Sequence, residues 1–201
     1  MTKRFSSNYS VCKKLKNSYK NIWGLKKKDS CRSVLNKVKK KVTPFGRLLD
    51  IKQSLKLFYP NMKESCFKNV VEFSLASPSK TLDKLSSLLE SRLDSVLFRS
   101  CLVISFQQAR QIISHGYVCV NGKCSKLPGK KINKGDVVGI DISNNLFSKT
   151  DFTNILNSRS IPKYLELDLL NFRIIFLWDS NSKGIYYPIK LNYSNVTRFY
   201  K

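Results

Sequence analysis

The chain has 201 residues, and its 37 lysines and arginines against 13 aspartates and glutamates give it a formal net charge of +24. Hydrophobic residues make up 42% of the chain, which excludes wholesale disorder and indicates one or two small domains. A soluble enzyme that acts on small molecules has no need of such a charge. The charge indicates a polyanionic partner, either nucleic acid or an anionic membrane surface. The longest apolar stretch, residues 169–178, contains Asn171 and Arg173, so no transmembrane helix is predicted.

The N-terminal part is the most basic, with 15 basic and 2 acidic residues in residues 1–50. Tyr19 and Trp23 lie among these lysines, and we expect a basic arm that lies on a phosphate backbone. A solvated tail, a nuclear-localisation run and a weak organellar presequence over residues 1–7 are the alternatives. The arm lysines expected to contact such a backbone are Lys13, Lys14, Lys16, Lys26, Lys27, Lys28, Lys39, Lys40 and Lys41.

Helical periodicity follows the arm. Apolar residues at mixed spacings of three and four predict a helix within residues 45–75, which Pro60 ends. Leucines near a 3.6-residue period predict a second helix over about 79–98, beginning at Pro78 or Thr81.

A short, well-capped helix comes next. Ser105 at the N-cap and Gln108 three residues later form a capping box, and Gly116 stands at the C-cap position. Its predicted outer face is polar and carries Gln107, Arg110, Gln111 and Ser114.

Tight turns mark the following region. Asn121-Gly122 is a favoured type I′ turn and predicts a hairpin between residues 117–120 and 123–125. A basic connector over 126–131 and a turn at 134–136 lead to a closing strand over 137–142. After a linker rich in Asn, Ser and Thr, the strand-like runs are Tyr164–Leu170, Ile174–Trp178, Ile185–Leu191 and Val196–Tyr200.

The predicted fold class is α+β. We expect a helical basic N-terminal part, a compact helix-helix-hairpin-strand module and a β-rich C-terminal tail that packs back on the body. The expected segments are a basic arm (1–50), a helical segment (51–88), the small module (89–143), a linker (144–160) and a strand-rich segment (161–201).

The cysteines predict no metal site. The chain has one histidine and no C-x-x-C pair among Cys12, Cys31, Cys66, Cys101, Cys119 and Cys124. Most of these cysteines have apolar neighbours and no signal peptide is recognised, so we expect reduced, mostly buried thiols. No cofactor is expected.

Four blocks in order resemble a known module. They are Glu90-Ser91-Arg92-Leu93-Asp94, Ala109-Arg110-Gln111 through Ser114-His115, Val118-x-Val120-Asn121-Gly122-Lys123, and Lys134-Gly135-Asp136-Val137-Val138. Together they resemble the small RNA-binding module of ribosomal protein four of the small subunit. Outside the module, residues 161–168 and the ending Phe199-Tyr200-Lys201 are also similar to that family. The segments Ile113-Ser114-His115 and Val118-Cys119-Val120-Asn121 resemble its mitochondrial form from plants, algae and related protists.

The chain departs from the family at three places. Phe106 stands where the family commonly has an arginine, and Ser100-Cys101 replaces a Leu-Gly pair. Cys12 and Cys31 do not match the metal-binding cysteines of some members, so no metal is carried over.

The resemblance implies a site that reads RNA mainly by shape, because A-form RNA hides its base edges. Arginine forks, amides and lysines suit phosphates and sugar hydroxyls. The expected RNA-binding residues of the module are Arg92, Arg99, Ser105, Gln107, Arg110, Gln111, Ser114, His115, Asn121, Gly122, Lys123, Lys126, Lys130 and Lys131. For two of them the alternative is a structural role. Arg92 would then pair with a carboxylate, and His115 would cap helix carbonyls.

The implied function is a structural constituent of the small ribosomal subunit. The implied partners are small-subunit rRNA and neighbouring ribosomal proteins, with no membrane. Frequent Lys and Asn with only two alanines suggest an A/T-rich, organellar gene and hence a mitochondrial ribosome. The alternatives are an RNA-modifying enzyme, a tyrosyl-tRNA synthetase and a stand-alone RNA binder with the same module. The 58 residues after Ser143 are too few for an appended catalytic domain.

Overall fold

The computed structural model describes residues 43–59, 62–141, 160–186 and 193–200. Within these ranges the fold is α+β, with six helices and a five-stranded antiparallel sheet, which confirms the predicted class. The chain divides into two compact units, residues 1–72 with 187–201 and residues 73–186. The arm lysines from Lys13 to Lys41 and nearly all of the predicted linker 144–160 lie outside the described residues.

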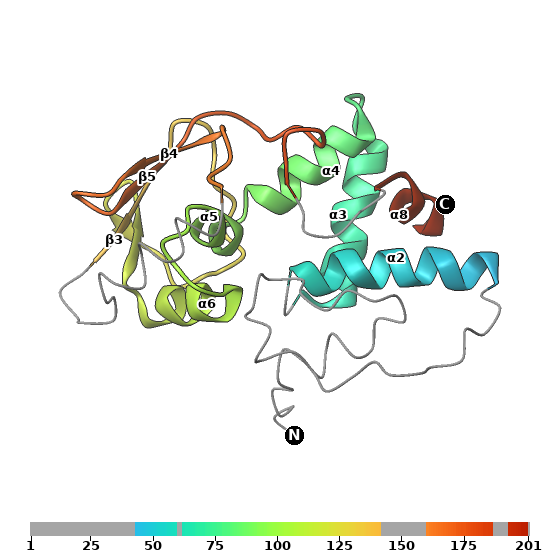
Figure 1. Cartoon of the computed structure of the whole chain (residues 1–201), viewed down its shortest axis with the longest axis horizontal. Coiled ribbons are helices and arrows are strands. Elements are labelled where there is room, and N and C mark those ends of the chain that lie inside the picture. Colours follow the sequence, from blue (N-terminus) through green and yellow to red (C-terminus); the bar gives the residue numbers. More distant parts are fainter. Residues whose placement is uncertain (1–42, 60–61, 142–159, 187–192, 201) are drawn as a thin grey trace, which may run out of the picture. The chain divides into compact units, whose positions relative to one another are not determined.

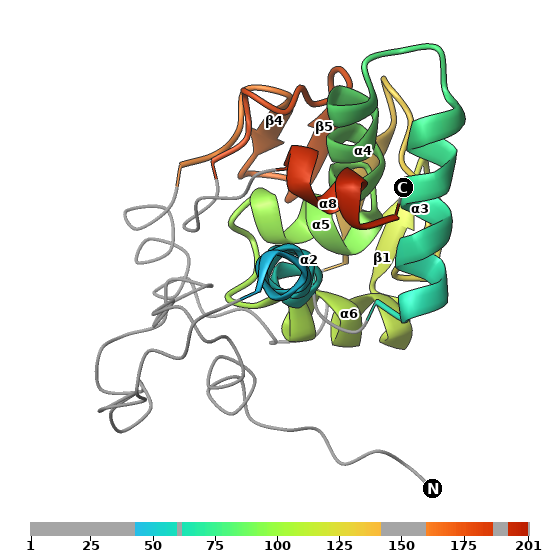
Figure 2. The same cartoon turned by 90° about the vertical axis from the view of Figure 1, so that its right-hand side faces the viewer.

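The first unit contains α2 (Pro44–Phe58), most of α3 (Glu64–Ala76) and α8 (Tyr193–Tyr200) (Figure 2). Thr43 caps α2 by accepting a hydrogen bond from the Gly46 amide at 3.1 Å, with a proline at the first helical position. α2 ends two residues before Pro60, as predicted, and α3 is a separate helix that the sequence pattern did not resolve.

α8 corrects the expectation of a strand over Val196–Tyr200. Tyr193, Val196 and Thr197 are buried at the 3-and-4 spacing of one helix face. This face packs on α2, where the rings of Phe45 and Phe199 lie 5.5 Å apart. The aromatic and β-branched residues that indicated a strand therefore serve a short amphipathic helix, because tertiary packing overrides local propensity.

Glu64 links α2, α3 and α8. Its carboxylate accepts hydrogen bonds from Lys52 Nζ at 2.7 Å, Lys56 Nζ at 2.6 Å and the Tyr200 hydroxyl at 2.7 Å. Burial opposes ionisation of Glu64, but the three donors outweigh it and lower its pKa to about 2. Burial and the bond to Glu64 raise the pKa of Tyr200.

The second unit begins with α4 (Thr81–Glu90) and α5 (Leu93–Arg99), where a single helix over 79–98 was predicted. The helix is broken where the backbone of Ser91 and Leu93 bonds to residues 130–132. The Ser91 carbonyl accepts from the Ile132 amide at 2.7 Å, and the Leu93 amide donates to the Lys130 carbonyl at 2.9 Å. The leucine periodicity continues through the break, so the sequence pattern does not reveal it.

α6 (Phe106–His115) has the predicted caps. Ser105 Oγ accepts from the Gln108 amide at 3.2 Å, and Gly116 adopts a left-handed conformation with φ 87°. The return bond of the capping box is displaced by one residue, since Gln108 Oε1 accepts from the amide of Ile104 at 2.8 Å.

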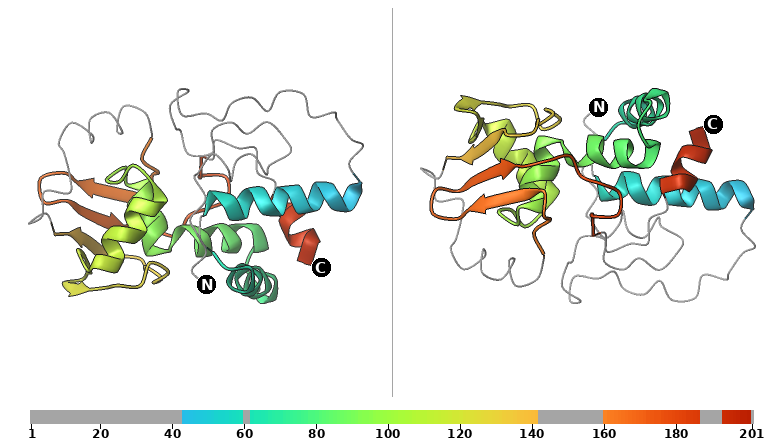
Figure 3. Two further views of the ribbon diagram at one scale, coloured as in Figure 1. Left: turned by 90° about the horizontal axis from the view of Figure 1, so that it is seen from below. Right: turned by 90° about the horizontal axis from the view of Figure 1, so that it is seen from above.

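The sheet has the order β2-β1-β3-β5-β4. The strands are β1 (Val118–Val120), β2 (Lys123–Cys124), β3 (Val137–Ile140), β4 (Leu165–Asp168) and β5 (Arg173–Phe176). α5 and α6 lie against one face (Figures 1 and 3), where the buried side chains are Val118, Val120, Val138, Ile140, Ile174 and Phe176. The predicted C-terminal strands do pack back on the body, because β5 pairs with β3.

The last two predicted strand runs differ from the structure. Ile185 and Tyr186 belong to no strand, and the rest of that run lies outside the described residues. The final run is α8.

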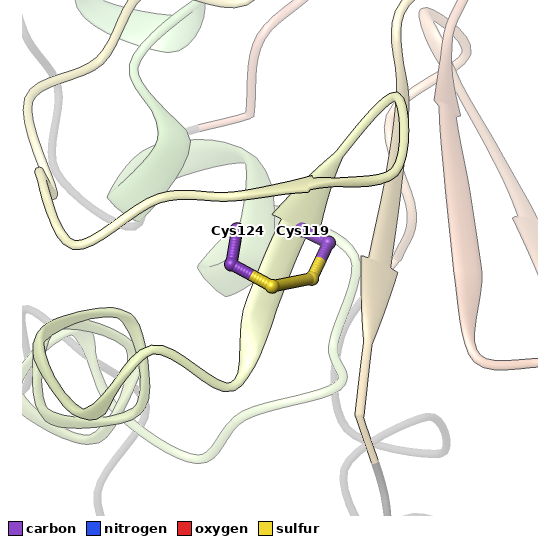
Figure 4. The surroundings of a disulfide bond; sticks show 2 residues. All are labelled: Cys119 and Cys124. Atoms are coloured by element: carbon purple, nitrogen blue, oxygen red, sulfur yellow. A yellow bond between two sulfur atoms is a disulfide. The ribbon is translucent and has the colours of Figure 1, made fainter.

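A disulfide joins Cys119 and Cys124 (Figure 4), which corrects the expectation of reduced thiols for this pair, whereas, among the described cysteines, Cys66 and Cys101 form no disulfide and Cys101 is buried, as expected. The two residues are direct partners across the β1–β2 ladder, so both side chains lie on one face of neighbouring strands. Asn121 and Gly122 have positive φ values of 51° and 79°, as the predicted type I′ turn requires. Burial was also misjudged, since Cys66 is exposed.

Candidate nucleic-acid interface

Two of the three predicted RNA-binding arginines of the module share one buried carboxylate. Arg92 donates from Nε and Nη2 to the two oxygens of Asp94 at 3.0 and 2.9 Å. Arg110 donates from Nη1 to Asp94 Oδ2 at 2.9 Å, so α6 is tied to the start of α5. Only 4% of the Asp94 side chain is exposed, against 25% of Arg110. Two cations on one carboxylate leave one net positive charge, and Arg110 keeps a solvent-facing part.

The third arginine, Arg99, also pairs with a buried carboxylate. It donates from Nε and Nη2 to the Glu90 carboxylate at 3.0 and 2.7 Å, and from Nη1 to the Tyr186 carbonyl at 2.7 Å. The Tyr164 hydroxyl donates to the same carboxylate at 2.8 Å. Glu90 is fully buried, so this cluster joins α4, α5 and the C-terminal segment.

The basic connector, residues 126–131, lies across the α4–α5 junction. The Asp94 amide donates to the Pro128 carbonyl at 3.1 Å, and Arg92 forms a β-bridge with Lys131. A Cβ atom added at Gly129 would meet the Arg92 guanidinium at 3.6 Å. The connector is thus held by its backbone, which leaves its lysine side chains available to a ligand.

The exposed part of α6 is polar. Gln111, Ser114 and His115 are exposed and Gln107 is half-buried. Ser114 Oγ donates to the Arg110 carbonyl at 2.8 Å, within the helix. The rings of His115 and Tyr117 lie nearly parallel, with centroids 5.9 Å apart.

The hairpin turn is tied to the loop before β3. Asn121 Nδ2 donates to Asp136 Oδ1 at 2.8 Å, and the Val137 amide donates to Asn121 Oδ1 at 2.9 Å. The Asn121 side chain therefore positions the turn, whatever else it contacts. Lys123, directly after Gly122, is exposed.

The predicted site residues thus fall into two groups. One group forms bonds that hold the fold: Arg92, Arg99, Ser105, Ser114 and Asn121. The other presents exposed or half-buried polar atoms: Gln107, Arg110, Gln111, His115, Gly122, Lys123, Lys126, Lys130 and Lys131. The alternative that Arg92 pairs with a carboxylate is confirmed by Asp94, but sequence reasoning missed Glu90 as the partner of Arg99 and Asp94 as the partner of Arg110. The alternating charges of Glu90-Ser91-Arg92-Leu93-Asp94 were the signal for them.

Neither a metal site nor a membrane-spanning helix is found in the parts of the chain that the structure describes. There, no three His, Cys, Asp or Glu side chains are grouped to hold an ion. None of the described helices has the length and apolar character needed to cross a bilayer.

A model of the S4 domain matches residues 91–138, the region from the α4–α5 break into β3. The small ribosomal subunit protein uS4 of Aquifex aeolicus is 37% identical over 166 residues, covering 81% of this chain and 77% of that protein. This chain belongs to the uS4 family. The uS4 protein of Caulobacter vibrioides is 30% identical over 206 residues, covering all of this chain and 99% of its own. The uS4 likeness therefore includes α2, α3, β4, β5 and α8 as well as the S4 domain.

Proposed function

We propose that this chain is a structural component of the small ribosomal subunit, where it binds small-subunit rRNA and supports assembly and translation. The observation that carries the proposal is the likeness to uS4 proteins over the whole chain, including 99% of the Caulobacter vibrioides protein. An RNA-modifying enzyme with the same module would match only within that module. The relatives are ribosomal proteins, so no catalytic activity is assigned.

The RNA-facing surface that we propose is made of the hairpin, the connector and the outer face of α6. Lys123, Lys126 and Lys131 are exposed there, and ammonium groups on a fixed backbone suit phosphates. The Lys126 stem lies against Gly116, where an added Cβ would approach Lys126 Cε to 3.4 Å. The basic arm, residues 1–50, supplies a second set of contacts in this proposal, and neighbouring small-subunit proteins are further partners.

The proposed location is the mitochondrial ribosome. The sequence resembles the mitochondrial form of the family, and the excess of lysine over arginine with only two alanines fits an A/T-rich organellar gene. Copurification tests this directly: the tagged chain is expected in a mitochondrial small subunit. Recovery in free fractions, unbound to the small subunit, would favour a stand-alone RNA-binding or RNA-modifying factor instead.

Salt dependence tests the RNA contact. For binding of the full chain to transcribed small-subunit rRNA, the slope of log affinity against log salt is expected to be about −5 or steeper. Replacing Lys123, Lys126 and Lys131 by alanine is expected to make it shallower by about 2, since each lost phosphate contact removes roughly 0.7–0.9. The matched control is Lys68→Ala on α3, an exposed lysine outside the module. A flat salt response of the unaltered chain would contradict the proposal.

A further inference from the structure

The two ends of the sheet in the second unit differ in chemistry. At one end, called here the hairpin end, the Asn121 amide donates to the Val137 carbonyl at 2.9 Å and the Gly135 amide to the Phe176 carbonyl at 2.8 Å. The hairpin turn, the loop before β3 and the last residue of β5 are therefore neighbours. The opposite end carries the β4–β5 turn, residues 169–172.

Trp178 lies at the hairpin end, two residues after β5, with 49% of its surface exposed. The Leu177 amide donates to the Tyr164 carbonyl at 3.0 Å, and the exposed Lys163 precedes Tyr164 in the turn that the Leu165 amide closes on the Pro162 carbonyl at 3.1 Å. Lys163 therefore also lies near the end of β5. Lys134 Nζ lies 3.3 Å from Asp179 Oδ2, beside the tryptophan in sequence. A large aromatic side chain is thus half exposed at an end of the sheet that also carries the exposed lysines Lys134 and Lys163.

This combination matches the chemistry of an unpaired RNA base. A flat indole offers a stacking surface to any base, and lysines on either side neutralise the adjoining phosphates. The ion pair between Lys134 and Asp179 is solvent-exposed, so a phosphate can replace its carboxylate at small cost. A protein partner would instead be expected to favour an apolar surround.

The opposite end of the sheet supplies a control residue. Asp168 accepts from the amides of Leu170 and Asn171, at 3.0 and 3.4 Å, and is paired with Arg173 across the β4–β5 ladder, so charges of both signs lie there. Leu170 is 92% exposed at that turn, and its side chain has no ring on which a base could stack.

We propose that Trp178 stacks on an unpaired base of the bound RNA, with Lys134 and Lys163 contacting the flanking phosphates. The proposal rests on the RNA-binding function proposed above. It extends the RNA contact beyond the residues matched by the S4 domain, 91–138, into the C-terminal segment.

The two tryptophans of the chain, Trp23 and Trp178, allow a direct measurement. In a Trp23→Phe variant, all tryptophan emission comes from Trp178, in the native side chain. Titration with transcribed small-subunit rRNA, and with a single-stranded oligouridine, is expected to quench that emission, because stacking on a base quenches indole. The affinity of the Trp23→Phe chain for rRNA is measured separately and is the reference for the Trp178 variants. Quenching that follows the binding curve of this chain to saturation supports the proposal.

Replacement then measures the contribution of the ring. Trp178→Ala is expected to lower rRNA affinity about tenfold, with the salt slope unchanged because no cation is removed. Trp178→Phe should retain most of the affinity, and Leu170→Ala should retain all of it. Lys134→Ala should instead make the salt slope shallower by about one.

Three results separate the possible failures. If the unaltered chain does not bind rRNA, the proposed function fails. If it binds, but Trp178 emission is unchanged at saturation and Trp178→Ala binds normally, only the stacking contact is overturned. Normal rRNA affinity of Trp178→Ala combined with loss from assembled subunits would assign the ring to a protein contact, which also overturns the stacking proposal. Equal urea midpoints for Trp178→Ala and Trp178→Phe exclude a folding defect as the cause of lost affinity.

Discussion

Arg99 pairs with Glu90 through two hydrogen bonds, and the Glu90 carboxylate is fully buried. Removing the guanidinium leaves a buried charge without its counter-ion, which typically costs about 3–5 kcal/mol. We expect Arg99→Ala to destabilise the second unit by that order. Urea unfolding of the Trp23→Phe chain, followed by Trp178 emission, measures it, because Trp178 belongs to the same unit.

The matched control for Arg99 is Tyr164→Phe, which removes one hydrogen bond to the same carboxylate. We expect a smaller cost of about 1–2 kcal/mol. If both variants lowered the free energy of unfolding equally, the paired Arg99–Glu90 hydrogen bonds would contribute no more than the single bond from Tyr164.

Asp94 allows the structural and the RNA-binding roles of Arg110 to be separated. Asp94→Asn is expected to cost about 2 kcal/mol, less than a fully buried pair, because Arg110 is partly exposed. It should leave the salt slope of rRNA binding no shallower, since both cations remain. Arg110→Gln should instead make that slope shallower by about one. An unchanged slope in Arg110→Gln would remove Arg110 from the RNA contacts.

Glu64 gives the first unit an acid-sensitive link. Its pKa falls from 4.5 to about 2 on folding, so its contribution is complete above pH 4.5 and is lost as the pH falls toward 2. About half of the side chain is exposed, so solvent screening limits the effect to the order of 1 kcal/mol. Hydrogen-exchange protection of the α8 amides, measured between pH 5 and about 2.5, is expected to fall with pH and to lose this component in Glu64→Gln.

Glu72→Gln on the same helix is the control for Glu64. Glu72 Oε1 lies 3.5 Å from Lys68 Nζ, and both side chains are exposed, so this ion pair contributes little. The α8 amides should therefore keep the pH dependence of their exchange protection. If the α8 amides lost their pH dependence in Glu72→Gln, the overall charge of the unit and not the Glu64 hydrogen bonds would cause that dependence.

A substitution at Asn121 tests whether this side chain holds the hairpin turn in place or contacts RNA directly. Asn121→Ala removes two side-chain bonds to the loop before β3 and should cost about 1–2 kcal/mol in urea unfolding. We expect rRNA affinity to fall by less than in Lys123→Ala, measured below the unfolding transition. A greater fall than in Lys123→Ala would indicate a direct contact by Asn121.

Local signals in the sequence were sufficient where a bond is made within a few residues. The Ser105 cap, the left-handed Gly116 and the Asn121-Gly122 turn each depend on neighbours close in the chain. The break between α4 and α5 could not be predicted in this way, because the carbonyl and amide groups that hold it come from residues 128–132. The helical form of residues 193–200 likewise depends on α2, far away in the sequence.

The residues of the candidate site divide in the same way, into those predictable from local sequence and those that depend on distant residues. Exposed lysines on the hairpin and connector could be predicted from charge and turn patterns alone. Pairing of Arg92 with a carboxylate was among the alternatives, because Asp94 is only two residues away. The pairing of Arg99 with Glu90 and of Arg110 with Asp94 could not be predicted, since a sequence does not state which side of a short helix faces a neighbour. Trp178 was missed because its exposure depends on where β5 ends relative to the loop before β3.

β3 pairs on one side with β1 and on the other with β5, although the residues matched by the S4 domain end within β3. During synthesis, therefore, this strand has an open edge until the chain has been made as far as Phe176. Such an edge is a template for pairing with another chain. The sheet edge of the S4 domain is consequently covered only when most of the chain has been translated.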